Sequence, residues 1–441
     1  MFLHLMKWEA GSSSGTLLNF NLYSYYQFYF MQVTNIDLLM AAFGVRRINF
    51  TSLYLRASPL GPLWGVALTL LVIFQACSSA PEVEVPEDIA AMENVAVYSG
   101  LEEPQYDISL TEHARFGDTD EIFISSISGI AVDDNGNLFL ADQSEATVHS
   151  YDAEGQYRFS IGRRGEGPGE FNAAYQPRIH NGELYVLDIN QQRISVFNPE
   201  DGTFLQTHPL GGGSDDLSGF PVQAEPLSDG RFLVFYNQME RDGDEFLMGR
   251  IPRILDGEGN MLSSEFIEFR PAEMYMVQSE TNVQIMSLPF MGSTYADVSP
   301  AEEIVWGFSD RILLHAVNME GDTIRSIYHS REKPPLDRDG MIANYEDEAM
   351  KDALRSMDIP DTRQAFTDIE TDDQNRIWIT LPTVNEEENE IWVLAQTGEK
   401  LAAFTRPATD MIELVDDGFV YIRETDEETG LAEVVKYRFD L

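Results

Sequence analysis

The sequence predicts an all-β fold, a six-bladed β-propeller in which an N-terminal strand closes the last blade and one helix is inserted. Three observations lead to this prediction. One strand pattern runs twice in succession over residues 129–197, similar segments follow it along the chain, and the last of them is one strand short. A repeat of about fifty residues that is built from short strands is typical of a propeller blade.

The two clear copies of the pattern consist of short alternating strands joined by tight turns. The first copy covers residues 129–162, and the second covers residues 180–205. Between their apolar runs both copies carry Asn, Asp or Glu followed by glycine, at Gly136, Gly155, Gly182 and Gly202. Asn-Gly and Asp-Gly pairs are the strongest short-range signals for a hairpin. Both copies therefore predict antiparallel strands that follow one another directly.

Further segments show the same alternation and bring the number of blades to six. The predicted blades cover residues 128–162, 176–210, 220–262, 283–324, 365–401 and 411–439. The last blade lacks one strand, which would leave an open sheet edge beside the first blade. Residues 106–117 lie directly before the first blade, in the same place that residues 157–162 take before the second blade. We therefore expect residues 106–117 to pair with the C-terminal strands and close the ring.

One segment between the fourth and fifth blades has helical rather than strand periodicity. Residues 344–357 begin with Asn344, a favourable N-cap, and end before Pro360. Apolar residues recur at helical spacing at Ala349, Met350, Ala353, Leu354 and Met357. We expect an inserted amphipathic helix whose apolar side packs on the propeller rim, with a lid over the central mouth as the alternative.

The chain is strongly acidic, with a formal net charge of -45. Residues 77–441 contain 25 basic and 72 acidic side chains, so this part alone carries -47. Such a field repels phosphate backbones, which makes nucleic acid a poor partner. A solvated acidic surface suited to a salty medium accounts for the charge, and specific metal binding is the alternative.

The N-terminal region has the features of an export signal. Residues 63–74 are a run of 12 apolar or nearly apolar residues that follows three arginines. Twelve residues are too few to span a bilayer of about 30 Å, but they suit the apolar part of a signal peptide. Residues 1–76 are therefore assigned to export. Residues 1–39 lie too far upstream for this role, and a later start of translation is the alternative for them.

Cys77 is the single cysteine of the chain, so no intramolecular disulfide can form. Residues 74–79 resemble a bacterial lipobox, although Phe74 stands where an aliphatic residue is usual. The resemblance implies lipidation of Cys77, which becomes the N-terminus after cleavage. An ordinary signal with Cys77 as an incidental thiol is the alternative. Residues 77–95 would then form a Pro- and Glu-containing linker between the lipid and a propeller domain at 96–441.

The repeat also resembles a known sequence family. Residues 129–133, 135–142 and 165–171 resemble an NHL repeat, and residues 96–441 resemble the six-bladed β-propeller lipoproteins of bacterial envelopes. The resemblance implies a cell-envelope location, with the propeller anchored through lipid to a membrane and facing the periplasm or the cell surface. It also implies binding of a ligand or a protein.

Three features that invite a catalytic or metal-binding interpretation fit blade construction better. Residues 162–169 are rich in glycine and arginine but lack the Lys-Ser/Thr pair of a phosphate loop, which favours a connection between blades. Residues 133–136 lack the alternating ligands and terminal glutamate of an EF-hand, which favours a hairpin turn. Asp142 and Asp188 recur at one blade position, and this recurrence predicts a structural role in the turn that follows.

The sequence does not favour a zinc enzyme or a serine nucleophile. None of the seven histidines forms a close pair with metal-ligand spacing, and no Gly-x-Ser-x-Gly motif is present. No cofactor is predicted, although calcium stays open. Lactonase-like six-bladed propellers hold calcium in the central channel with ligands from different blades, so a calcium-dependent hydrolase or lactonase is the alternative function.

A binding site is expected at the mouth of the central channel, where the innermost strands meet. The polar residues predicted on those strands are Gln176, Arg178, Gln223, Gln284 and Asp368. Arg178 could orient an anionic or polar ligand, or it could pair with neighbouring carboxylates. The predicted function is a non-catalytic module that binds a small molecule, a glycan or an envelope protein.

Overall fold

The computed structural model describes residues 85–441, apart from 121, 212–218, 243–244, 263–265, 279–282, 289 and 427–428. The predicted export segment, Cys77 and the first part of the predicted linker lie outside these residues. Within the described part, no helix combines the length and the apolar character that crossing a bilayer requires.

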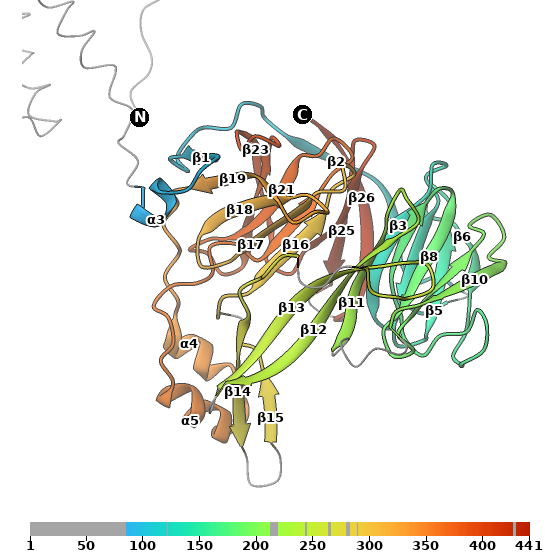
Figure 1. Cartoon of the computed structure of the whole chain (residues 1–441), viewed down its shortest axis with the longest axis horizontal. Helices are drawn as coiled ribbons and strands as arrows, with labels where there is room; N and C mark the ends of the chain where they lie inside the picture. Colours follow the sequence, from blue (N-terminus) through green and yellow to red (C-terminus); the bar gives the residue numbers. More distant parts are fainter. Residues whose placement is uncertain are drawn as a thin grey trace, which may run out of the picture. The chain divides into compact units, whose positions relative to one another are not determined.

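The described residues form six sheets arranged in a ring, so the protein is a six-bladed β-propeller (Figure 1). Blade one consists of β3 (Ile127–Val132), β4 (Leu138–Asp142), β5 (Thr147–Tyr151) and β6 (Tyr157–Ile161). Blade two consists of β7 (Ala174–His180), β8 (Glu183–Asp188), β9 (Arg193–Phe197) and β10 (Phe204–Pro209). Both blades follow the repeat that the sequence predicts.

The remaining blades keep this antiparallel order with additions. Blade three contains β11 (Phe220–Pro226), β12 (Phe232–Asp242) and β13 (Glu245–Leu255), followed by β14 (Ala272–Gln278) and β15 (Val283–Met286). Blade four contains β16 (Thr294–Val298), β17 (Ile304–Phe308), β18 (Ile312–Val317) and β19 (Thr323–His329). Blade five contains β20 (Asp368–Thr371), β21 (Ile377–Pro382), β22 (Glu388–Leu394) and β23 (Lys400–Pro407).

The predicted closure of the ring is confirmed in blade six. This blade contains β24 (Met411–Asp416), β25 (Phe419–Thr425) and β26 (Ala432–Asp440), and its fourth strand is β2 (Ser109–Phe116). β2 pairs antiparallel with β26, from Ser109 opposite Asp440 to Phe116 opposite Val434. The two ends of the propeller are thus held in one four-stranded sheet, with β2 as its outermost strand.

Another N-terminal strand joins the ring at a different place. β1 (Val95–Tyr98), which follows the short helix α3 (Glu87–Ala90), pairs in parallel with β19 and extends blade four to five strands. The Tyr98 ring stacks on the His329 ring at a centroid distance of 4.7 Å. The sequence predicts no strand in this segment, which falls at the predicted boundary between the linker and the domain.

The predicted first strand of blade four is wrong. Residues 283–286 form β15, which makes a hairpin with β14, and the innermost strand of blade four is β16. The apolar residues after β15 belong to a different part of the core: Leu288 and Phe290 pack in a cluster with the inserted helices. β16 carries Asp297, and a polar strand of this kind is hard to detect by its apolar alternation.

The predicted single helix at 344–357 is replaced by two shorter helices. Asp337 is the N-cap of α4 (Arg338–Ala343), and its carboxylate accepts the Gly340 N–H at 3.0 Å. Asn344 is therefore the C-terminal cap of α4, and α5 (Glu348–Ser356) begins four residues later. Figure 1 shows both helices beside the β14–β15 hairpin, with which they share an apolar cluster that includes Leu354.

The hydrophobic core lies between neighbouring blades rather than in the middle of the ring. One cluster joins blades four and five around Ile327, Phe366 and Trp392. Another joins blades six and one around Tyr421 and Leu138. Burial of such side chains stabilises the fold by about 1.5–3 kcal/mol each. Packing of this kind leaves the centre of the ring to polar side chains.

Candidate functional site

The centre of the ring holds a cavity of about 430 Å³ that is lined by residues from the innermost strands of the blades. These strands are β3, β7, β11, β16, β20 and β24, so every blade contributes to the wall. β20 shows how the wall forms, because its side chains alternate. Ile369 is buried against other blades, whereas Asp368 and Glu370 face the cavity on either side of it.

Four of the five predicted ligand-binding residues line this channel. Gln176, Arg178, Gln223 and Asp368 lie around it on β7, β11 and β20. Gln284 does not, because it belongs to β15 and pairs with Val277 of β14. In blade four, to which Gln284 was expected to belong, the strand that lines the channel is β16.

Five further charged residues line the channel that the sequence did not point to. Their positions are Arg250, Asp297, Glu370, Glu413 and Arg423. Alternation along the predicted strands could have found Glu370, two residues after Asp368, and Glu413, two residues after the start of β24. Arg250 and Arg423 come from β13 and β25, which are not innermost strands, and only their long side chains reach the channel.

Arg178 is held by a carboxylate from the next blade. Its Nε donates to both carboxylate oxygens of Glu225, at 3.0 and 2.8 Å. Glu225 also accepts a hydrogen bond of 3.0 Å from Gln223, whose carbonyl oxygen accepts from Arg250. Arg178 is thus paired with a carboxylate of the next blade. Glu225 and nearby carboxylates raise the pKa of Arg178, although burial opposes this effect.

A second ion pair lies in the channel wall where blade six meets blade one. Arg423 Nε lies 2.9 Å from a carboxylate oxygen of Glu413, and its Nη1 donates to the Ile127 carbonyl at 2.8 Å. Burial raises the pKa of Glu413, while Arg423 acts in the opposite direction. This arginine thus bridges β25 to the first strand of the ring.

Three further carboxyl groups line the channel, and none of them contacts an arginine directly among the described residues. Asp297 accepts hydrogen bonds from the Thr371 N–H at 2.8 Å and from its hydroxyl at 2.5 Å. Asp368 accepts from the Ile369 N–H at 3.0 Å. For Glu370, no side-chain hydrogen bond or ion pair is found within the part of the chain that the structure describes.

The pKa values of these carboxyl groups are raised. Burial, reinforced by the charges of Glu413 and Asp297, raises the pKa of Asp368 to about 7. Burial followed by repulsion from Asp297 and Asp368 raises the pKa of Glu370 well above its usual value. Burial also raises the pKa of Asp297. These groups therefore hold protons more tightly than exposed carboxylates do.

In the described part of the chain, two buried polar atoms of channel residues have no hydrogen-bond partner, the Gln176 side-chain carbonyl oxygen and Arg250 Nε. Gln176 is held at φ +38°, where Gly129 of the neighbouring strand approaches it closely. Gly129 has φ +131°, and a β-carbon there would lie 3.1 Å from the Gln176 Cα, so both backbone conformation and space favour glycine at this position.

The aspartates that recur in the blades are structural, as predicted. The Asp142 carboxylate accepts from the Ser125, Ser144 and Glu145 N–H groups, at 2.6, 2.9 and 3.1 Å. Asp188 binds the corresponding turn in blade two, and both side chains are fully buried. In the described residues, no group of three or more His, Cys, Asp or Glu side chains is arranged to hold a metal ion.

Comparison with known proteins agrees with the fold. The family described as 6-bladed beta-propeller matches residues 116–246. No curated protein matches the chain in sequence.

Several solved structures are similar over most of their length. A candidate exported protein of Bacteroides fragilis is 12% identical, with 79% of this chain and 99% of that one covered and a TM-score of 0.46. Virginiamycin B lyase of Staphylococcus aureus is 12% identical, with 75% and 99% covered and a TM-score of 0.40. Aldose sugar dehydrogenase of Streptomyces coelicolor is 10% identical, with 77% and 100% covered and a TM-score of 0.38. These identities and TM-scores are too low to transfer a function from the solved structures to this chain.

Proposed function

We propose that the protein is a non-catalytic binding module of the bacterial cell envelope, and that its central channel holds a small molecule with a cationic group. The observation that carries this proposal is an excess of acidic side chains around the channel. Four carboxyl groups line the channel, and Glu225 lies behind them as the partner of Arg178, against three guanidinium groups. The lining carboxyl groups are Asp297, Asp368, Glu370 and Glu413, and the guanidinium groups are those of Arg178, Arg250 and Arg423.

Protons or a bound cation can balance this excess of negative charge in the channel. Without a ligand, the carboxyl groups keep protons, which is what the raised pKa values of Asp368 and Glu370 express. A protonated amine in the channel would favour their ionised forms and release these protons. Binding of an amine is therefore expected to strengthen as the pH rises through the pKa of Asp368, about 7.

The size and chemistry of the channel suit a small polar ligand. Its volume of about 430 Å³ lies within the range of roughly 300–1,000 Å³ that is common for ligand pockets. The unpartnered Gln176 carbonyl oxygen can accept a hydrogen bond from an ammonium group. Glu370 can add a charge-assisted hydrogen bond.

Calorimetry with matched probes tests this proposal. 1,5-Diaminopentane and 1,5-pentanediol share a carbon chain, but only the diamine is cationic from pH 6 to 8. We expect the diamine to bind, more tightly at pH 8 than at pH 6, and the diol not to bind. Glu370→Gln is expected to weaken binding about tenfold, because it removes a charged partner. The exposed Asp339 of α4 provides the control Asp339→Asn, which changes charge outside the channel.

Two results would contradict the cationic ligand. One is equal binding of diol and diamine, and the other is no diamine binding at either pH. Calcium is the alternative cation, and with it a hydrolase or lactonase is the alternative function. Stoichiometric, chelator-sensitive calcium together with lactone hydrolysis that Glu370→Gln abolishes would replace the binding module by that enzyme.

The envelope location is supported by the lipobox-like sequence around Cys77. Cys77→Ser is expected to abolish labelling by a fatty-acid analogue and to move the protein out of the membrane fraction. A variant that keeps the label would show that the anchor is not Cys77.

A further inference from the structure

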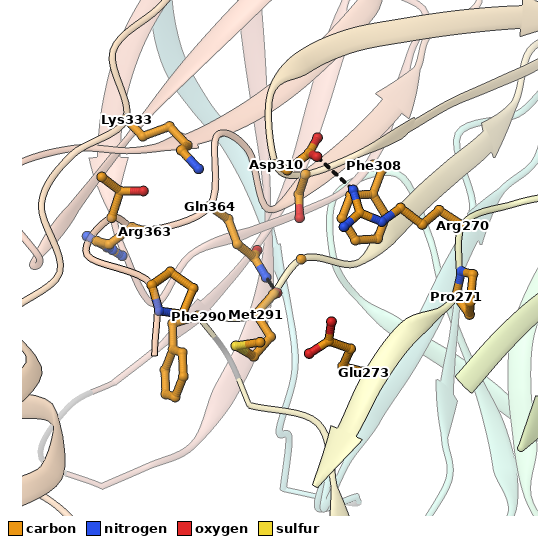
Figure 2. Close-up of a pocket in the computed structure, with 14 residues that line it drawn as sticks. Arg270, Pro271, Glu273, Phe290, Met291, Phe308, Asp310, Lys333, Arg363 and Gln364 are labelled. Atoms are coloured by element: carbon orange, nitrogen blue, oxygen red, sulfur yellow. Dashed lines mark hydrogen bonds and ion pairs between the residues drawn. The ribbon is translucent and has the colours of Figure 1, made fainter. Parts of the chain in front are cut away.

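A second cavity lies outside the channel and shares no residue with it. It has a volume of about 240 Å³ and is bounded by residues 270–273 and 290–292, by the turn at 308–310, and by Lys333 and residues 360–364 (Figure 2). The last two segments flank the helices α4 and α5. This cavity is therefore formed where the helical insertion leaves and rejoins the propeller.

Part of the cavity wall is apolar. Phe290 is 6% exposed, and Met291, Phe308 and Pro271 continue the surface. Gly292 makes this packing possible, because a β-carbon there would lie 2.4 Å from the Phe308 ring. These apolar residues of the wall can thus contact a ring or a short aliphatic chain of a ligand.

Three cationic side chains also line the cavity, but one of them is already neutralised. Arg270 forms an ion pair of 2.8 Å with Asp310, and its guanidinium carbon lies 4.0 Å from the centre of the Phe308 ring. Figure 2 shows this pair across the cavity from Lys333 and Arg363.

Lys333 and Arg363 have no acidic partner among the residues that the structure describes. Arg363 donates to the Thr383 carbonyl at 3.1 Å, a neutral acceptor, and both side chains are partly buried. Of the carboxylates in the cavity, Asp310 is bound by Arg270, and Glu273 accepts the Tyr275 hydroxyl at 2.8 Å. Three cations and two carboxylates leave an excess of one positive charge.

A local positive excess is unusual in a chain with a net charge of -45. The overall field repels anions, so an anion needs cations close to it in order to bind. Lysine and arginine on one side of a cavity can supply both charge and hydrogen bonds to a carboxylate.

We propose that this cavity binds a small organic acid, with its carboxylate at Lys333 and Arg363 and its apolar body against Phe290, Met291 and Phe308. The volume is smaller than that of drug-sized pockets of roughly 300–1,000 Å³, which suits a molecule of about one ring. This site is separate from the channel and goes beyond the function proposed for it.

Benzoate, benzyl alcohol and benzylamine test the proposal, because they share a ring and differ in charge. Saturation-transfer NMR and calorimetry on the propeller are expected to show binding of benzoate and little or none of the other two. Lys333→Gln is expected to weaken benzoate binding about tenfold. Lys351→Gln makes the same charge change on α5 at a lysine that pairs with Glu348, and it is expected to have no effect.

Three results would overturn this assignment. Benzyl alcohol or benzylamine that binds as well as benzoate would show that the carboxylate is not recognised. Equal losses in Lys333→Gln and Lys351→Gln would show only a general charge effect. If a protein with a normal melting transition, and therefore folded, does not bind benzoate, the cavity does not take an organic acid of this size. Asp368→Asn, which changes the channel, is expected to leave benzoate binding as it is.

Discussion

At the scale of single residues, the channel is unusual because it buries more carboxyl groups than arginines. Asp368 is the clearest case, since its pKa is raised to about 7. A carboxyl group whose pKa is raised by folding stabilises the protein fully below its unfolded pKa of about 3.9. This contribution is lost as the pH rises through the folded value. Ionisation of the channel thus works against folding above about pH 7.

Asp368→Asn is therefore expected to be more stable than the wild type at pH 8, by about 1–3 kcal/mol. The gain should disappear near pH 4, where Asp368 is protonated in the folded protein. Asparagine keeps an oxygen that can accept the Ile369 N–H. Denaturant titrations at the two pH values measure the difference. Asp339→Asn is the control and is expected to show no such gain. A gain in Asp368→Asn that does not depend on pH would contradict the raised pKa of Asp368.

At the scale of elements, the helical insertion is a separate packing unit. Leu354 of α5 is fully buried, and its cluster consists of residues from the insertion and from the β14–β15 region. The sequence signalled a helix here, but its caps were misassigned. Asp337 supplies the N-cap of α4, and Asn344 ends that helix instead of starting the next one.

Leu354→Ala is expected to destabilise this unit by about 2–5 kcal/mol, because it leaves a cavity in a small cluster. Hydrogen exchange should increase in α4 and α5 and stay unchanged in β4 and β5 of blade one, since local units can open separately. Leu314→Ala, at an equally buried position in the core between blades four and five, is the comparison and should lower the melting temperature of the whole propeller. Equal exchange increases in blade one for both variants would show that the insertion unfolds only with the ring.

At the scale of the whole molecule, stability depends on closure of the ring. β26 pairs with β25 on one side and with β2 on the other, so it joins the two ends of the propeller. Its residues Val434 and Val435 are fully buried in the clusters on either side of blade six. Removal of this strand would leave β2 without a partner and expose both clusters.

Deletion of the last 12 residues, 430–441, is therefore expected to abolish cooperative folding. Circular dichroism and calorimetry should show no melting transition for the truncated protein, whereas deletion of Leu441 alone, an exposed residue after the strand, should change little. An unchanged melting temperature after the longer deletion would contradict closure by β2 and β26.

The sequence by itself determined the number of blades, the closing strand and four of the channel residues. Alternation and Asn-Gly or Asp-Gly turns are local signals, and the missing strand of blade six followed from counting. Only the tertiary structure decided the ion pairs and surplus charges of the channel. Arg178 and Glu225 are 47 residues apart, and Thr371 and Asp297 are 74 apart. Such contacts depend on how the blades face each other around the ring, and local periodicity carries no information about that arrangement.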